Sequence, residues 1–212
     1  MEEICDYLAS LQQEKNSLLT EMEHFAKTHH IPIMESSSLN MMIQFLRIQQ
    51  PKRILEIGTA IGYSALRMAD ALPNVHIVTI EREAVRCRQA HDYISRAHGA
   101  KNRITIIEGD ALEVFAQVEA FGHFDAIFID AAKGQYRRFF ELYTPLLQDN
   151  GCVYTDNVLY KGLVAKENIE NRRASGFVKK IKAYNQWLMD HPAFITEILP
   201  VGDGVAVSLK KA

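Results

Sequence analysis

The sequence is short of the residues that define special classes of protein. Its three cysteines, Cys5, Cys87 and Cys152, lie far apart and show neither metal-site nor disulfide-framework spacing, so we expect reduced thiols in a reducing compartment. No apolar run is long enough to span a membrane, and the acidic N-terminal segment has no basic stretch followed by an apolar core. We therefore expect a cytoplasmic protein with no membrane segment.

An excess of charge of either sign is also absent. The chain has 24 Lys and Arg residues against 26 Asp and Glu residues, a formal net charge of −2, so its overall charge does not make it a polycationic binder of nucleic acid. Any such binding must come from a local basic patch. Because the 212 residues contain no internal repeat, low-complexity tract or Pro/Gly-rich linker, we expect one domain over residues 1–212.

Apolar strand-like segments alternate with amphipathic helical segments from Pro51 onward. The pattern predicts strands at residues 53–57, 76–80, 103–107, 124–130, 151–155, 194–199 and 205–209, and helices at residues 63–72, 83–98, 112–118 and 136–147. Before Pro51, helices are predicted at residues 4–30 and 36–49. The chain therefore divides into a helical N-terminal extension, residues 1–50, and a core, residues 51–212.

The order of these segments predicts an α/β fold. Each of the first five strands is followed by a helix, which implies a parallel sheet covered on both faces. The last two strands are separated only by residues 200–204, too few for a helical crossover, so they should form an antiparallel hairpin. We expect a seven-stranded, mostly parallel sheet that ends in this hairpin.

Residues 53–64 combine a strand, a glycine turn and the start of a helix, so that a ligand can lie against bare backbone and a helix N-terminus. Ala60 occupies the position of the middle glycine in the dinucleotide fingerprint. Glu56 is a poor neighbour for a pyrophosphate and suits a cationic ligand, such as an amino-acid ammonium beside a sulfonium. A generic strand-to-helix loop is the alternative.

An acidic or amide group stands at the end of each of the first five strands, where folds of this kind bind ligands. Glu81, at the second strand, is placed to accept hydrogen bonds from both ribose hydroxyls of an adenosine-containing ligand. Gly109, Asp110 and Ala111, after the third strand, would border the adenine ring. The N-cap of the next helix is an equal alternative for Asp110.

The fourth and fifth strands end in Asp130 and in Asp156-Asn157, which form an all-oxygen set with neither thiol nor imidazole. Such a set favours a hard divalent cation, Mg²⁺ above all, although a turn after a strand also favours Asp-Asn. Lys133, three residues past Asp130, would lie over the metal with a lowered pKa and act as a base. The alternative is a surface lysine.

Basic residues gather between positions 161 and 182. They include Lys161, Arg172, Arg173, Lys179 and Lys180, and Arg137 and Arg138 extend the group. Charge runs of this kind are commonly solvated helix faces. Because this run directly follows Asp156-Asn157, we expect a basic rim beside the mouth of the site, suited to a phosphate-bearing substrate such as RNA or a coenzyme A ester.

With these motifs in place, the chain resembles the class I, Rossmann-like O-methyltransferases that depend on S-adenosylmethionine and metal, of the catechol and caffeoyl-coenzyme A type, over essentially its whole length. The resemblance implies that residues 55–64, with Glu56 and Gly58, form the cofactor loop and that Glu81 binds the ribose. It implies that Asp130 serves cofactor and metal together, that Asp156 and Asn157 bind the metal, and that Lys133 and Asp130 are catalytic. It further implies that Met34 and Ser64 contact S-adenosylmethionine. A homodimer is expected by the same analogy.

Among the subgroups, the chain is most similar to the bacterial enzymes that methylate 5-hydroxyuridine at the tRNA wobble position to 5-methoxyuridine. The 5-hydroxyl and 4-oxo groups are adjacent oxygens that can chelate Mg²⁺ as a catechol does, and a base in an anticodon loop can be splayed into a pocket. We expect in-line attack of the hydroxyl oxygen on the sulfonium methyl, with Mg²⁺ lowering the hydroxyl pKa.

Three alternatives stay open. A methyltransferase of small catechols or coenzyme A-linked vicinal diols fits the same motifs, but a small catechol does not need the basic segment. An NAD-dependent oxidoreductase is disfavoured by Ala60 and by the terminal hairpin. A non-catalytic RNA-binding protein is disfavoured because the catalytic and metal-binding residues implied by the resemblance are all present.

Overall fold

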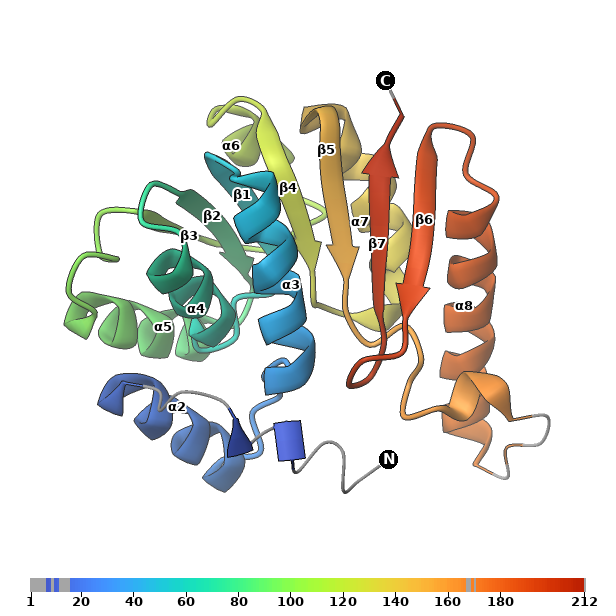
Figure 1. The fold of residues 1–212 in the computed structure, drawn as a ribbon, viewed down its shortest axis with the longest axis horizontal. Coiled ribbons are helices and arrows are strands. Elements are labelled where there is room, and N and C mark those ends of the chain that lie inside the picture. The colour runs from blue at the N-terminus through green and yellow to red at the C-terminus, as the bar shows by residue number, and fades with distance from the viewer. Residues whose placement is uncertain (1–6, 9, 12–15, 167–168, 170, 212) are drawn as a thin grey trace.

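The computed structural model describes residues 7–8, 10–11, 16–166, 169 and 171–211, with only the backbone of residues 172 and 173. In this part of the chain seven strands form one sheet (Figure 1). Its order is β3-β2-β1-β4-β5-β7-β6, and only β7 pairs antiparallel to its neighbours. The strands are β1 (Arg53–Ile57), β2 (His76–Glu81), β3 (Ile104–Glu108), β4 (Phe124–Ile129), β5 (Leu147–Thr155), β6 (Phe194–Leu199) and β7 (Val205–Lys210). The predicted seven-stranded α/β fold with a terminal hairpin is confirmed.

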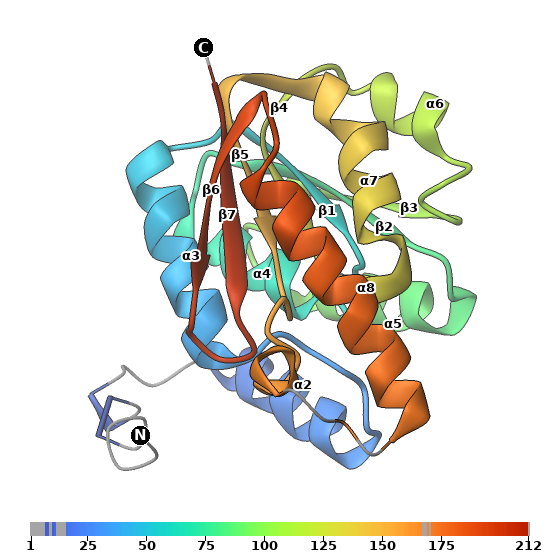
Figure 2. The same cartoon turned by 90° about the vertical axis from the view of Figure 1, so that its right-hand side faces the viewer.

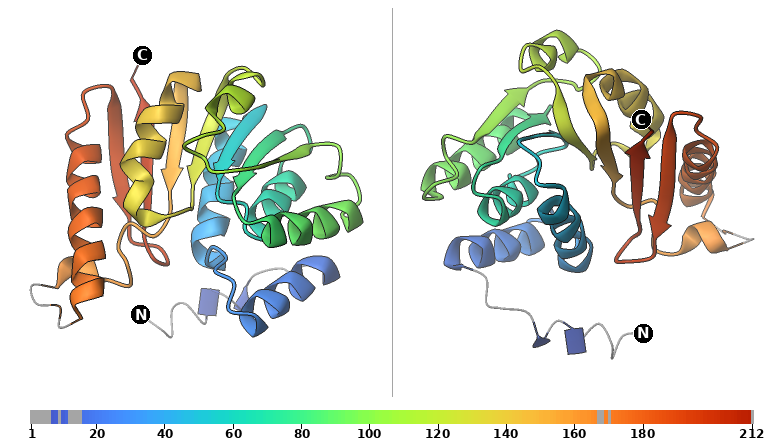
Figure 3. Two further views of the ribbon diagram at one scale, coloured as in Figure 1. Left: turned by 180° about the vertical axis from the view of Figure 1, so that it is seen from behind. Right: turned by 45° about the horizontal axis from the view of Figure 1, so that its top comes forward.

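Helices cover both faces of the sheet (Figures 2 and 3). One face carries α2 (Ser17–Thr28), α3 (Ser36–Gln49), α4 (Tyr63–Ala71) and α5 (Ala84–Arg96). The other carries α6 (Phe115–Glu119), α7 (Tyr136–Tyr143) and α8 (Arg172–Met189). A hydrophobic core lies on each face of the sheet, and successive strand residues point alternately into one core and the other. Ile54 packs with the first group of helices and Leu55 with the second. The strands are therefore apolar on both sides, as a covered parallel sheet requires.

The N-terminal helix differs from its prediction. Residues 4–6, 9 and 12–15 of the expected helix 4–30 lie outside the described residues, and α2 begins only at Ser17. Asn16 sets this start, because its side-chain oxygen accepts a hydrogen bond from the Leu19 amide at 2.9 Å. The helical periodicity on both sides of Asn16 concealed this N-cap.

Smaller differences occur at other element ends. The predicted helix 136–147 ends at Tyr143, because Pro145 enters the short 3₁₀ turn η2 (Thr144–Leu146) and Leu147 already pairs with Phe124 in the sheet. Strand β5 therefore begins four residues before its predicted start, with a register shift against β4. The predicted helix 112–118 is realised as α6, Phe115–Glu119.

The carboxyl ends of the parallel strands lie together at the lower edge of the sheet in Figure 1. The turn between β6 and β7 reaches the same edge, beside the start of α3 (Figure 2), where Ser38 Oγ donates to the Val201 carbonyl at 2.9 Å. Among the described residues, no helix combines the length and apolarity needed to cross a membrane. Cytoplasmic location stays a prediction.

Candidate active site

A cavity of about 320 Å³ opens at the carboxyl ends of β1, β2, β3 and β4, a size in the range of small-molecule sites. Ten of the residues predicted for the site line it: Met34, Gly58, Ser64, Glu81, Gly109, Asp110, Ala111, Asp130, Lys133 and Asn157. Two others, Glu56 and Asp156, lie behind its wall and are 0% and 1% exposed. The structure thus gathers the predicted cofactor and metal residues around one space.

Gly58 makes the close approach of β1 and β4 possible. Its φ is +106°, and a Cβ there would lie 2.0 Å from the Asp130 carbonyl oxygen. The amides of Gly58 and Thr59 both donate to the Ile80 carbonyl, at 3.0 and 3.1 Å. The turn is therefore braced against β2 and β4, and any residue larger than glycine at position 58 would separate the two halves of the cavity.

Glu56 is placed as a buried support beneath the cavity. Its carboxylate oxygens accept hydrogen bonds from Ser64 Oγ and Thr79 Oγ1, each at 2.5 Å. Burial raises the pKa of Glu56 to about 7 against the lowering effect of these two hydroxyls, and the charges of Asp130 and Glu81 add to the rise. Glu56 is therefore placed to influence the cavity through Ser64 and through its charge rather than from the cavity surface.

Glu81 is held rigidly at the end of β2. One carboxylate oxygen accepts from the Ala60 amide at 2.9 Å, and the other accepts from the amides of Arg82 and Glu83, both at 3.0 Å. The carboxylate is 7% exposed and lines the cavity. This geometry fits an acceptor for ribose hydroxyls, because three backbone donors fix its position and Oε2, which accepts only from the Ala60 amide, keeps a further lone pair.

Asp110, in the segment after β3, lines the cavity but does not cap the next helix, whose N-cap is Val114. Asp110 Oδ1 accepts from the Leu112 amide at 2.9 Å, as a turn cap does, and the residue also lines the cavity. A Cβ on Gly109 would lie 2.4 Å from Val114 Cγ1, so the backbone there packs too tightly for a side chain. Ala111 is fixed by Tyr143 Oη, which donates to its carbonyl at 2.6 Å. Together they form one wall of the cavity.

Asp130 and Asp156 converge because β4 and β5 are parallel neighbours, as predicted. The Asp130 amide donates to the Ile57 carbonyl at 2.9 Å, and the Asp156 amide donates to the Ile129 carbonyl at 3.1 Å. Asn157 has a left-handed backbone, with φ of +59°. Lys133 begins the short η1 turn (Lys133–Gln135), and its Nζ donates to Asn157 Oδ1 at 2.5 Å. All four side chains thus belong to one cluster.

The cluster fits a divalent cation. Asp156 Oδ1 is buried and has no hydrogen-bond partner among the described residues. Burial, followed by the charge of Asp130, raises the pKa of Asp156 to about 8, and burial raises that of Asp130 to about 6 against the lowering effect of Lys133. The two carboxyl groups oppose each other's ionisation, and one of them has a buried oxygen without a partner among the described residues. A bound cation would offset the repulsion and occupy that oxygen.

A metal site here would need the carboxamide oxygen of Asn157 in addition to the two carboxylates. In the described part of the chain, no group of three or more His, Cys, Asp or Glu side chains is arranged to hold a metal ion. The oxygen donors at this point are Asp130, Asp156 and the carboxamide of Asn157. Such an all-oxygen set suits Mg²⁺ rather than a soft metal.

The predicted basic rim is only partly assembled at this edge. Lys180 on α8 reaches the loop after β4, since a Cβ on Gly134 would lie 3.6 Å from its Nζ. Lys161 and Lys179 are exposed, and Arg138 donates to Gln135, a cavity residue, at 3.0 Å. Arg137 instead pairs with Glu141 at 2.8 Å and covers the Trp187 ring at 4.9 Å. The side chains of Arg172 and Arg173 lie outside the described residues.

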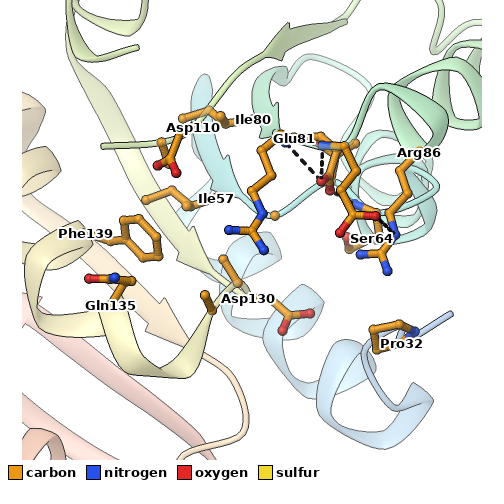
Figure 4. A pocket seen from close by; sticks show the side chains of 18 of the residues that line it. Pro32, Ile57, Ser64, Ile80, Glu81, Arg86, Asp110, Asp130, Gln135 and Phe139 are labelled. Carbon is orange, nitrogen blue, oxygen red and sulfur yellow. Dashed lines mark hydrogen bonds and ion pairs between the residues drawn. The ribbon is translucent and has the colours of Figure 1, made fainter. Parts of the chain in front are cut away.

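Several lining residues were not predicted from the sequence. Figure 4 shows Phe139 and Gln135 on one side of the cavity and Arg86 and Ser64 on the other, with Pro32 at its edge. Arg86 forms an ion pair with Glu83 at 3.4 Å. Its place in the first turn of the helix after Glu81 is a signal that could have been used. Pro32 and Phe139 come from segments whose position depends on packing, and no motif marks them.

Comparison with known proteins defines the family. Residues 9–211 match the O-methyltransferase family. Catechol O-methyltransferase of Niastella koreensis is 32% identical over 220 residues, which cover 99% of this chain and 97% of the relative. A Staphylococcus aureus protein described as a candidate caffeoyl-CoA O-methyltransferase has 42% identity and a TM-score of 0.91, covering 97% of this chain and 98% of its own. A Bacillus cereus O-methyltransferase in complex with SAH has 26% identity and a TM-score of 0.84, covering 99% and 97%.

The chain belongs to the O-methyltransferase family. Within it, the chain is of the S-adenosylmethionine-dependent catechol and caffeoyl-coenzyme A type, as its sequence motifs predict. This result favours an enzyme over a non-catalytic RNA-binding protein and a methyltransferase over an oxidoreductase.

Proposed function

We propose that the protein transfers a methyl group from S-adenosylmethionine to one of two adjacent oxygens of an acceptor held beside Asp130, Asp156 and Asn157, and that this acceptor is 5-hydroxyuridine in tRNA. The observation that carries the first part is the buried, unpaired Asp156 Oδ1 beside a cofactor-sized cavity. Family membership supplies the reaction class.

The cavity orients the cofactor by its polar groups. Glu81 accepts hydrogen bonds from the ribose hydroxyls, and the adenine is bordered by Gly109, Asp110 and Ala111. Ser64, backed by Glu56, and Met34 lie at the amino-acid end, where a negative charge suits an ammonium and a sulfonium. In this arrangement the sulfonium methyl would lie between the adenosine pocket and Asp130.

Asp130, Asp156 and Asn157 would hold a Mg²⁺ ion. Bound there, the ion supplies a Lewis acid that lowers the pKa of the acceptor hydroxyl and fixes two adjacent acceptor oxygens. The chain's own residues do the rest. Lys133 Nζ, fixed on Asn157 Oδ1 at 2.5 Å, faces the same space and takes or orients the hydroxyl proton. Gly58 keeps Asp130 close to the cofactor, and this alignment supplies much of the acceleration.

The choice of 5-hydroxyuridine is supported by its chemistry and by the basic residues at the rim. Its 5-hydroxyl and 4-oxo oxygens are vicinal, as the cation-binding set requires, and its phosphate backbone suits Lys180, Lys161 and Lys179. A small catechol would bind the same oxygen donors without using the lysines. The two acceptors are therefore distinguished by the rim.

Tritiated methyl transfer from labelled S-adenosylmethionine tests the proposal. We expect efficient labelling of tRNA that bears 5-hydroxyuridine, weak labelling of a small catechol, and loss of both after chelation. Labelling of the catechol alone would move the function to small vicinal diols. Full activity in chelator would exclude the cation role, and binding of NAD but not of S-adenosylmethionine would exclude methyl transfer.

A further inference from the structure

The loop after β5 has an unusual backbone just past the cation-binding residues. Asn157, Tyr160 and Lys161 have φ of +59°, +47° and +54°, and Gly162 follows with +72°. L-residues other than glycine rarely adopt this left-handed region, and persist there only where surrounding contacts hold them. Three such residues within five positions indicate that something outside the loop fixes it.

The turn between β6 and β7 provides these contacts. The Val158 amide donates to the Gly204 carbonyl at 3.1 Å, and the Leu159 amide donates to the Asp203 carbonyl at 2.9 Å. Asp203 Oδ1 accepts a short hydrogen bond from the Lys161 amide. Asp203 therefore holds the loop twice, by its backbone and by its side chain. Its carboxylate supports the part of the loop with consecutive left-handed residues.

The turn is itself fixed in place by its two glycines. A Cβ on Gly204 would lie 2.3 Å from Leu159 Cγ, so the turn packs directly on the loop. Gly202 has φ of +55°, and a Cβ there would lie 2.1 Å from Ser38 Oγ. Ser38 in turn donates to the Val201 carbonyl. The β6–β7 turn is thus wedged between the start of α3 and the loop that carries Asn157.

Asp203 also lies close enough to affect the site electrostatically. Burial and the charge of Asp130 are the main causes that raise the pKa of Asp156, and the charge of Asp203 adds to them. Asp203 does not line the cavity. It is therefore placed to act through the loop and not on the acceptor.

We propose that Asp203 is a positioning residue for methyl transfer: by holding the Lys161 amide it fixes the loop so that Asn157 and Asp156 present their oxygens to the cation. The inference rests on the proposed function. The Lys161 amide needs an acceptor oxygen at the Oδ1 position. The position of the loop should therefore depend on this hydrogen bond more than on the charge of Asp203.

Three substitutions separate these roles. Asp203→Ala removes the acceptor oxygen, and Asp203→Ser leaves no oxygen at the Oδ1 position but keeps a good turn former. Both should weaken Mn²⁺ binding by about ten-fold or more, the usual effect of removing a supporting group behind a metal ligand. Asp203→Asn keeps a carbonyl oxygen for the Lys161 amide, so its Mn²⁺ affinity should fall by much less than the roughly ten-fold expected for the other two variants.

Mn²⁺ titration followed by electron paramagnetic resonance is the primary measurement, with calorimetric titration of S-adenosylmethionine and thermal unfolding beside it. Cofactor affinity should be unchanged, because Glu81 and Asp110 follow β2 and β3, in the opposite half of the sheet from β6 and β7. Asp149→Ala is the matched control: this carboxylate is 84% exposed and pairs with Lys210 elsewhere on the sheet, and its loss should leave Mn²⁺ binding unchanged.

The outcomes are distinguishable. If the unsubstituted protein binds no Mn²⁺ and methylates without a cation, the proposed function fails. If it binds Mn²⁺ and the Asp203→Ala and Asp203→Ser proteins bind it equally well, the inference about Asp203 is overturned. Weak binding by Asp203→Asn also overturns it, since the charge and not the hydrogen bond would then be responsible. Should Asp203→Ala fail to fold, the Ser and Asn variants decide.

Discussion

At the scale of single residues, burial changes the chemistry of two carboxyl groups. The sequence predicted Glu56 for the cofactor and Asp156 for the metal, and the structure adds that both side chains are buried, at 0% and 1% exposed. Whether a strand-end carboxylate points into a cavity or lies beneath its wall depends on the helices packed around it. The residues around each carboxylate in the sequence do not determine that packing. The orphaned Asp156 oxygen and the two hydroxyls on Glu56 were therefore visible only in the structure.

The raised pKa of Glu56 predicts a pH-dependent stability. Its pKa is about 7 in the folded protein against 4.5 ordinarily, so the folded state binds the proton more tightly. The contribution of Glu56 to the free energy of unfolding is fully present below pH 4.5 and is lost as the pH rises to about 7. This change in unfolding free energy is on the order of 3 kcal/mol. Glu56→Gln should remove this part of the pH dependence of stability. Denaturant unfolding of the cofactor-free protein at pH 5 and pH 8 measures it; equal pH dependence in both proteins would contradict the prediction.

Lys133 is predicted to serve chemistry and not affinity. Lys133→Ala should lower the rate constant of methyl transfer by about 10²-fold or more, the usual contribution of a group that moves a proton, while tRNA and cofactor affinities stay nearly unchanged. Single-turnover transfer to saturated tRNA separates the rate from binding. An equal loss in the rate and in tRNA affinity would instead place Lys133 among the rim residues.

At the scale of elements, the sequence predicted each strand of the sheet and the glycine turn after β1. It placed element ends less well where a local contact decides them, as with the Asn16 cap, the Pro145 turn and the early start of β5. The β6–β7 hairpin was predicted from its short connection. Its contact with the loop after β5 was not, because the two segments are more than forty residues apart and share no pattern.

Gly58→Ala tests the strand-turn-helix element. The added methyl group would meet the Asp130 carbonyl at 2.0 Å, in a backbone conformation with φ of +106°. Both effects force β1 and β4 apart, so we expect a loss of about 2 kcal/mol or more of unfolding free energy and loss of measurable cofactor binding. Gly99→Ala is the control, because its φ is also positive at +84° but no atom lies within 4 Å of the added Cβ. Similar losses in both proteins would show that backbone strain alone is responsible.

At the scale of the whole molecule, sheet order places the site where β1 and β4 meet at its centre. The antiparallel hairpin could be predicted from its short connection, whereas the full order of the strands is seen only in the structure. The distribution of basic residues could not be predicted either, since Arg137 turned out to cover Trp187 and pair with Glu141. Whether two copies associate stays a prediction, which sedimentation analysis can test.

Charge reversal tests the basic rim. Substituting glutamate at Arg172, Arg173, Lys179 and Lys180 should weaken tRNA binding and reduce its dependence on salt concentration, because fewer counterions are released. Cofactor binding should survive. The control is Arg88→Glu with Lys101→Glu, two exposed cations on α5 and in the loop before β3, the edge strand opposite to β6. Filter binding at several salt concentrations gives the slopes; an unchanged slope would show that tRNA, if bound, is held elsewhere.

The sheet order also separates two tasks along the chain. The groups proposed for adenosine come from β1, β2 and β3, whereas Asp156, Asn157 and the β6–β7 turn come from the other half of the sheet. Only Asp130, beside Gly58 at the junction of β1 and β4, belongs to both. Acceptor preference can therefore diverge by exchange of the second half alone. A chimaera that joins residues 1–130 of this chain to the second half of a relative should inherit the relative's acceptor and keep this chain's affinity for the methyl donor.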